Sequence, residues 1–137
     1  MLKKLLSSMA VAAALVFPCA PDVVAAEMGT TPQTSNERGI KISVILQSIP
    51  NDAKTWDVEV TLEAHTQALS DDLTKSAVLM ADGKQYAPLR WKGAPPGGHH
   101  RKGLLRFKPI VPPPQSLELQ IRLAGDTSPR SFKWRLK

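Results

Sequence analysis

The sequence predicts an all-β protein, a single immunoglobulin-like β-sandwich of about seven strands behind a cleaved signal peptide. Three observations lead to this fold class. Short apolar runs alternate with polar residues at a period of two along most of the chain. Turn-forming residues separate these runs. No segment of helical period is long enough to form a stable helix by itself.

Residues 1–26 have the pattern of a secretory signal peptide. Two lysines, Lys3 and Lys4, precede an apolar stretch from Leu5 to Phe17, and small residues at positions 24–26 form a cleavage site before Glu27. The stretch is shorter than the roughly 20 apolar residues that span a bilayer. We therefore expect an exported protein, periplasmic or secreted, with no transmembrane anchor.

Cys19 is the only cysteine of the chain and lies within the predicted signal peptide. Lipidation at this cysteine is the alternative, but Val16, Phe17 and Pro18 are not the small residues that normally precede a lipidated cysteine. Cleavage after Ala26 leaves a protein without thiols or disulfides. Its stability must then come from the core alone.

Residues 27–39 are rich in Thr, Ser, Gln, Asn and Gly and show no apolar period, so we expect a flexible leader there. The β-sandwich domain is expected at residues 40–137, which is an ordinary size for one domain. The runs predicted to form its strands are Ile40–Gln47, Trp56–Ala64, Ala77–Met80, Gln85–Tyr86, Leu105–Phe107, Leu117–Leu123 and Phe132–Leu136. Asp82-Gly83 predicts a tight hairpin between the third and fourth runs.

The segment Lys92–Lys102 is the main irregular loop predicted, because it contains two prolines, three glycines and two histidines. Trp91 stands at the mouth of this loop, where an aromatic ring can form one wall of a site or close the end of the sandwich. His99 and His100 lie in the loop, and His65 follows the best-defined strand. Together these three histidines are a candidate site for copper, zinc or nickel.

The metal hypothesis has a structural alternative. Adjacent residues on a strand point to opposite faces, so His99 and His100 reach one metal only where the backbone is irregular. Two neighbouring histidines also lack the fixed spacings of specific metal motifs. In the alternative, the loop histidines cap backbone groups or stack on Trp91, and His65 is a half-exposed residue at a strand end.

The segment Gln85–Phe107 contains Tyr86-Ala87-Pro88-Leu89-Arg90-Trp91 and then Gly97-Gly98-His99-His100-Arg101-Lys102-Gly103-Leu104-Leu105-Arg106-Phe107. This pattern resembles a motif of small exported prokaryotic β-sandwich domains of unassigned function. Residues 62–69 and 132–136 are similar to parts of the same family. The resemblance implies a β-sandwich in which the loop matters, and it implies no catalytic role.

The sequence gives no reason to expect an enzyme. No serine lies in a nucleophile-elbow pattern, and the predicted mature chain has no cysteine. The acidic pair Asp71-Asp72 is typical of a turn. Gly97-Gly98 follows prolines and is not followed by a helix, so it is no phosphate-binding loop.

Charge is unevenly distributed along the chain. Residues 27–83 contain four basic and nine acidic residues, whereas residues 84–137 contain twelve basic and two acidic residues. The candidate partner-binding residues lie in the basic part and are Arg101, Arg106, Lys108, Lys133 and Arg135. If the strands that carry them are neighbours, they form a positive patch that attracts an anionic partner.

The sequence therefore predicts an exported, non-enzymatic binding module, with the loop and its possible metal ion as the leading hypothesis. The alternative is a module that docks on an acidic protein or envelope component through the basic strand face. Nucleic acid is not expected as a partner, since Phe132 and Trp134 fall on the inward face of their strand and leave no aromatic stacking surface. A basic strand face that only keeps the domain soluble is the third possibility.

Overall fold

The protein is a sandwich of two antiparallel sheets, as the sequence predicts. The structure is a computed structural model that describes residues 31–136. The five-stranded sheet has the order β1-β2-β3-β7-β6 and contains β1 (Gln33–Glu37), β2 (Ile40–Leu46), β3 (Trp56–Ala64), β7 (His100–Phe107) and β6 (Arg90–Gly93). The four-stranded sheet has the order β5-β4-β8-β9 and contains β5 (Lys84–Tyr86), β4 (Ala77–Ala81), β8 (Ser116–Ile121) and β9 (Arg130–Arg135).

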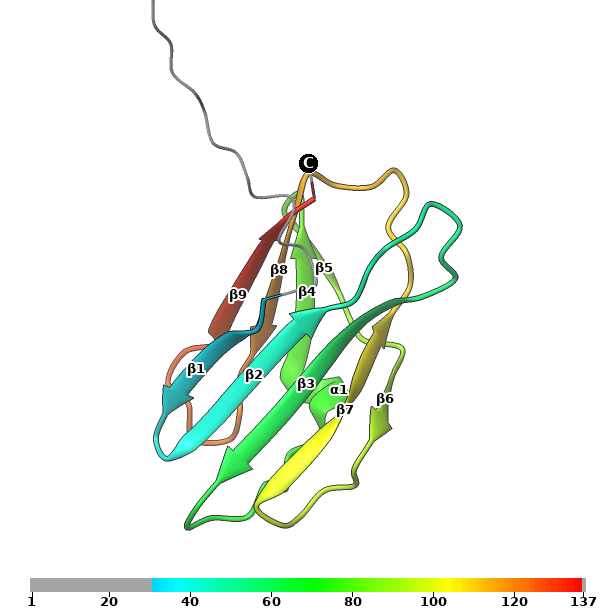
Figure 1. Cartoon of the computed structure of the whole chain (residues 1–137). Coiled ribbons are helices and arrows are strands. Elements are labelled where there is room, and N and C mark those ends of the chain that lie inside the picture. The colour runs from blue at the N-terminus through cyan, green and yellow to red at the C-terminus, as the bar shows by residue number, and fades with distance from the viewer. Residues whose placement is uncertain (1–30, 137) are drawn as a thin grey trace, which may run out of the picture.

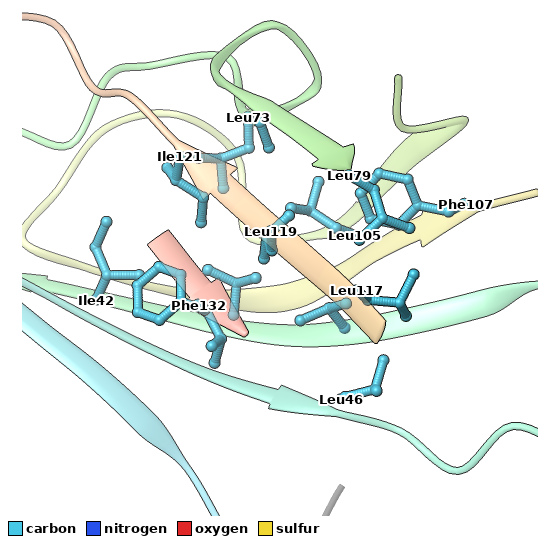
Figure 2. Close-up of a cluster of buried hydrophobic side chains, with 14 of the residues drawn as sticks. Ile42, Leu46, Leu73, Leu79, Leu105, Phe107, Leu117, Leu119, Ile121 and Phe132 are labelled. Atoms are coloured by element: carbon cyan, nitrogen blue, oxygen red, sulfur yellow. The ribbon is translucent and has the colours of Figure 1, made fainter. Parts of the chain in front are cut away.

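The core lies between the sheets and is made by the alternating apolar positions of their strands. In β3, for example, Val58, Val60 and Leu62 are buried, and the residues between them face outward. Figure 2 shows the side chains of the two sheets meeting in this core, with Phe107 and Leu105 from one sheet and Leu119 and Phe132 from the other. Burial of this apolar surface is the main driving force for folding.

The prediction of a flexible leader at residues 27–39 is wrong over its second half, because Gln33–Glu37 forms strand β1. β1 pairs antiparallel with β2 through a turn at Arg38 and Gly39, both with positive φ. Such a turn matches the twist of a hairpin. The strand carries no apolar side chain, so hydrophobic periodicity gave no sign of it. Residues 27–30 and the predicted signal peptide at 1–26 lie outside the described residues.

The described part of the chain contains nine strands rather than about seven. The predicted hairpin at Asp82-Gly83 is confirmed, since β4 pairs with β5 and both turn residues have positive φ. One short helix, α1 (Leu73–Ser76), precedes β4. The Asp72 side chain caps this helix by accepting a hydrogen bond from the Thr74 N–H at 3.0 Å.

The predicted irregular loop Lys92–Lys102 is shorter in the structure, because β6 continues to Gly93 and β7 begins at His100. Only residues 94–99 are irregular. Gly93 and Gly103 are paired in register, and a Cβ atom on either would lie within 2.6 Å of the other backbone. The two strands therefore approach more closely than side chains allow.

The sandwich has two sides at which the edges of the sheets meet. β1 and β9 form one side, and β5 and β6 form the other (Figure 1). The chain passes from β5 in one sheet to β6 in the other through residues 87–89.

Candidate functional site

Arg101 is a buried residue rather than a surface residue. It lies on the core-facing row of β7 and is 1% exposed. Its guanidinium group donates hydrogen bonds to the carbonyl oxygens of Leu69 at 3.2 Å, Asp71 at 2.8 Å and Ala94 at 3.3 Å. The prediction that Arg101 binds a partner is therefore wrong, because its guanidinium group is buried and hydrogen-bonded to the loops at this end of the sandwich.

Trp91 packs beside Arg101 at the base of the 94–99 loop. The centre of its ring lies 5.6 Å from the Arg101 guanidinium carbon, which is a cation–π contact. Its indole N–H donates to the Ala94 carbonyl oxygen at 2.8 Å. Gly103 leaves the space for the ring, since a Cβ atom there would lie 2.8 Å from a ring carbon. Trp91 thus lies at the base of the 94–99 loop and is held in place from two directions. Its role as the wall of a site stays a prediction.

The Arg101 charge has no carboxylate within ion-pair distance among the described residues. Its Nε–H has no hydrogen-bond partner. Burial lowers the pKa of Arg101 from its ordinary value, and Asp71 and Asp72 oppose this from a greater distance. Backbone carbonyls and an aromatic face make the direct contacts to this buried cation, and Asp71 and Asp72 stabilise it without forming an ion pair.

The three histidines do not form the predicted ligand set. His99 contacts the Gln67 carbonyl oxygen through Nδ1 at 3.0 Å. His100 is the first residue of β7 and is paired with Glu63 across the sheet, and His65 lies beyond the end of β3. Within residues 31–136 no group of three or more His, Cys, Asp or Glu side chains is arranged to hold a metal ion. Copper or zinc binding through another arrangement stays a prediction.

The predicted basic face is divided between the two sheets. β7, with Arg106, belongs to the five-stranded sheet, and β9, with Lys133 and Arg135, belongs to the four-stranded sheet. Lys108 lies just beyond the end of β7. The prediction that these residues form a single positive patch is therefore wrong, because β7 and β9 are not neighbouring strands.

Acidic residues of β3 neutralise the outward basic residues of β7. Arg106 approaches the Asp57 carboxylate at 3.4 Å, and Lys102 approaches that of Glu59 at 3.6 Å. The first pair follows from the register, in which Asp57 lies directly opposite Arg106, whereas Glu59 lies opposite Leu104 and approaches Lys102 diagonally. β7 consequently presents little uncompensated charge.

β6 carries two basic residues that no described ion pair compensates. Arg90 lies directly opposite Arg106, and Lys92 lies opposite Leu104. Both basic side chains are exposed, and neither takes part in an ion pair with any of residues 31–136. Sequence reasoning missed these two residues, although their alternation around Trp91 already placed them together on one face of a strand.

The backbone of β6 also has an unpaired side, because β6 is the last strand of its sheet. The Ala94 N–H donates to the Lys102 carbonyl oxygen at 3.1 Å. Hydrogen bonding alternates along an antiparallel ladder, so the N–H and C=O groups of Trp91 and Gly93 point away from β7. We call Arg90, Lys92 and these free backbone groups the basic edge.

Comparisons with known proteins add little to this description. No protein-family model and no curated protein matches the chain. Among solved structures, a secreted protein of Mycobacterium tuberculosis, MPT63, is similar at 15% sequence identity, over 78% of this chain and 93% of that one, with a TM-score of 0.45. A likeness this distant carries no information on function. Within residues 31–136, no helix has the length and apolar character needed to cross a membrane.

Proposed function

We propose that the protein is a non-enzymatic, exported binding module that pairs with an extended acidic segment of a partner protein along the basic edge. The carrying observation is the pairing of Arg90 with Arg106 on a strand whose other side is open. The partner class is the one expected from the sequence, an acidic protein or envelope component. The proposed binding site is on β6 instead of β7 and β9.

Charge favours such a partner. Like charges directly opposite each other on a sheet destabilise the pair. Asp57 compensates Arg106, whereas no acidic side chain of the described chain compensates Arg90. A Glu or Asp side chain on an added strand would lie beside Arg90 and Lys92 and remove this imbalance.

The backbone favours the same geometry. Addition of a strand to an open sheet edge gives affinity through main-chain hydrogen bonds and specificity through alternate side chains. The free groups of Trp91 and Gly93 offer such bonds, and the Trp91 ring is fixed by Arg101 and Ala94. The edge is therefore already ordered before a partner arrives, which lowers the entropic cost of binding.

Basic residues on an edge strand also prevent aggregation of sheets edge to edge. The experiment must therefore distinguish this role from specific binding of a partner. The probe is a fluorescent ten-residue peptide of alternating Glu and Val, and binding is followed by anisotropy. We expect saturable binding that weakens roughly tenfold or more in R90E/K92E and also weakens with added salt, which screens exposed charges.

The matched control is K133E/R135E, which reverses two charges on the outer side of β9. It should bind the peptide as the unchanged protein does. A second peptide with alternate amides methylated keeps its charge but cannot pair as a strand, and it should bind much more weakly. Equal binding of both peptides, or equal losses in both variants, would overturn strand pairing at β6.

A further inference from the structure

The end of the sandwich opposite Arg101 contains a partly open cavity that is lined mainly by apolar side chains. Its volume is about 270 Å³. It is formed by the β2–β3 loop, the β7–β8 loop and the C-terminal end of the described chain, all of which lie at one end of the molecule (Figure 1). Trp56 and Ile110, both buried, lie at its inner side, and Ile49, Ala53 and Leu136 are half-buried lining residues.

The side chains that line the cavity are almost all apolar, although polar atoms form a considerable part of its surface. Asn51 is the one polar residue among those that line the cavity, and four of the others are prolines. Proline has a fixed φ and no N–H group, so this rim is stiff and offers few backbone donors. Val111 on the same rim is 84% exposed, which is unusual for a large apolar side chain. The site is therefore suited to an apolar ligand that needs little reordering of the protein.

Three basic residues are close in sequence to the residues that line the cavity. Lys54, Lys108 and Arg135 are adjacent in sequence to the lining residues Ala53, Pro109 and Leu136, respectively. All three basic residues are exposed and take part in no ion pair with the described residues. Asp52 is the only acidic residue in the β2–β3 loop. The mouth of the cavity therefore favours an anionic group beside the apolar body of a ligand.

We infer that this cavity binds one acyl chain that ends in an anionic head group, such as a fatty acid. A single chain fits a partly open cavity whose volume, about 270 Å³, is slightly below the usual range of small-molecule sites. A flat membrane surface would use exposed Val111 and the lysines without entering the cavity. This site is independent of the basic edge, since the two share no residue.

The probe is dodecanoate, kept below its micelle concentration and titrated by calorimetry into the protein. Dodecyltrimethylammonium, with the same chain and a cationic head, is the matched ligand. We expect dodecanoate to bind at least roughly tenfold more tightly than the cation. The double variant K54E/K108E should abolish this preference, and it changes only exposed side chains.

The variant A53W fills the cavity and should lose dodecanoate binding, whereas A87W adds the same side chain at an exposed site between β5 and β6 and should not. Circular dichroism verifies folding of both. Dodecanoate binding that survives in A53W would overturn the site. Equal binding of wild type and A53W to phosphatidylglycerol vesicles, without binding of free dodecanoate, would replace it with a membrane surface. R90E/K92E should bind dodecanoate normally, so this result is separate from the peptide result.

Discussion

The two sides of the sandwich are built in opposite ways. On the side of β1 and β9, polar side chains connect the two sheets and occupy the free backbone groups at their edges. On the side of β5 and β6, the chain crosses between the sheets once, and no strand pairs with the outer side of β6, although α1 lies close to β6. The comparison indicates that the closed side serves stability and that the open side is available for recognition.

Arg130 is the centre of the closed side. It is buried in β9 and donates to the Ile40 carbonyl at 2.7 Å and the Glu37 carbonyl at 3.1 Å, both in the other sheet. Its charge is balanced by Asp126, whose carboxylate lies 3.2 Å from Nε. Asp126 in turn accepts the Leu123 N–H at 3.1 Å. Each member of this ion pair is thus hydrogen-bonded on several sides.

Gln33 closes the edge of β9. Its side-chain amide donates to the Lys133 carbonyl at 2.7 Å, and its side-chain oxygen accepts the Lys133 N–H at 3.1 Å. A single side chain thereby takes the place of a neighbouring strand. No described side chain is bonded in this way to the backbone of β6, and this is the physical difference between the two edges.

The largest expected effect comes from R130M. The substitution leaves the Asp126 carboxylate buried without its cation, and we expect a loss of about 3–5 kcal/mol in the free energy of unfolding. Urea denaturation measures this loss. The double variant R130M/D126N also removes the unpaired Asp126 charge and should recover part of the lost free energy of unfolding. A loss below about 1 kcal/mol in R130M would show that the ion pair does not hold the closed side together.

R101M should cost less, about 2–3 kcal/mol, because it leaves only neutral carbonyl groups without donors. The comparison with R130M therefore tests the difference between the two buried arginines. Urea denaturation again gives the value, and the tryptophan emission of the folded state should change because Trp91 loses its cation contact. R101M costing as much as R130M would mean that the missing carboxylate has no energetic consequence.

Q33A should cost about 1 kcal/mol, the usual net contribution of a small number of exposed hydrogen bonds. It also opens the edge of β9, so the Lys133 amide should exchange with solvent faster than in the unchanged protein. Amide hydrogen exchange by NMR measures this rate. An unchanged rate would contradict the role of Gln33 as a substitute strand.

The smallest effect concerns Glu118 on the outer side of β8. Hydrogen bonds from Ser131 and then Gln120 hold the pKa of Glu118 below its ordinary value. The stabilisation from a lowered carboxyl pKa is present above the unfolded value, about 4.3. It disappears as the pH falls through the folded-state pKa. S131A should raise this pKa in an NMR titration, and S43A, on the outer side of β2, should leave it unchanged.

The sequence predicted those parts of the fold that depend on apolar alternation. The strand at Trp56–Ala64 and the hairpin at Asp82-Gly83 are where the pattern placed them. β1 was missed because its side chains are polar and its stability comes from contacts such as those of Gln33 and Arg130. Contacts between residues about 100 positions apart leave no mark in a local pattern.

The candidate site was predicted less well than the fold, for the same reason. Trp91 was correctly placed at the mouth of the loop, but the burial of Arg101 follows from its inward register on β7. Strand order decides whether basic residues form one patch, and two-residue periodicity does not encode strand order. Arg90 and Lys92 became candidates only once β6 was known to be an edge.

Amide hydrogen exchange, measured by NMR on the protein with and without the alternating Glu-Val peptide, tests strand pairing at β6 most directly. We expect the peptide to slow exchange of the Trp91 and Gly93 amides, which face the open edge, and to leave the Lys133 amide of β9 unchanged. Slowed exchange at β9 with none at β6, or no change at either edge in the presence of bound peptide, would contradict the assignment of β6 as the recognition edge.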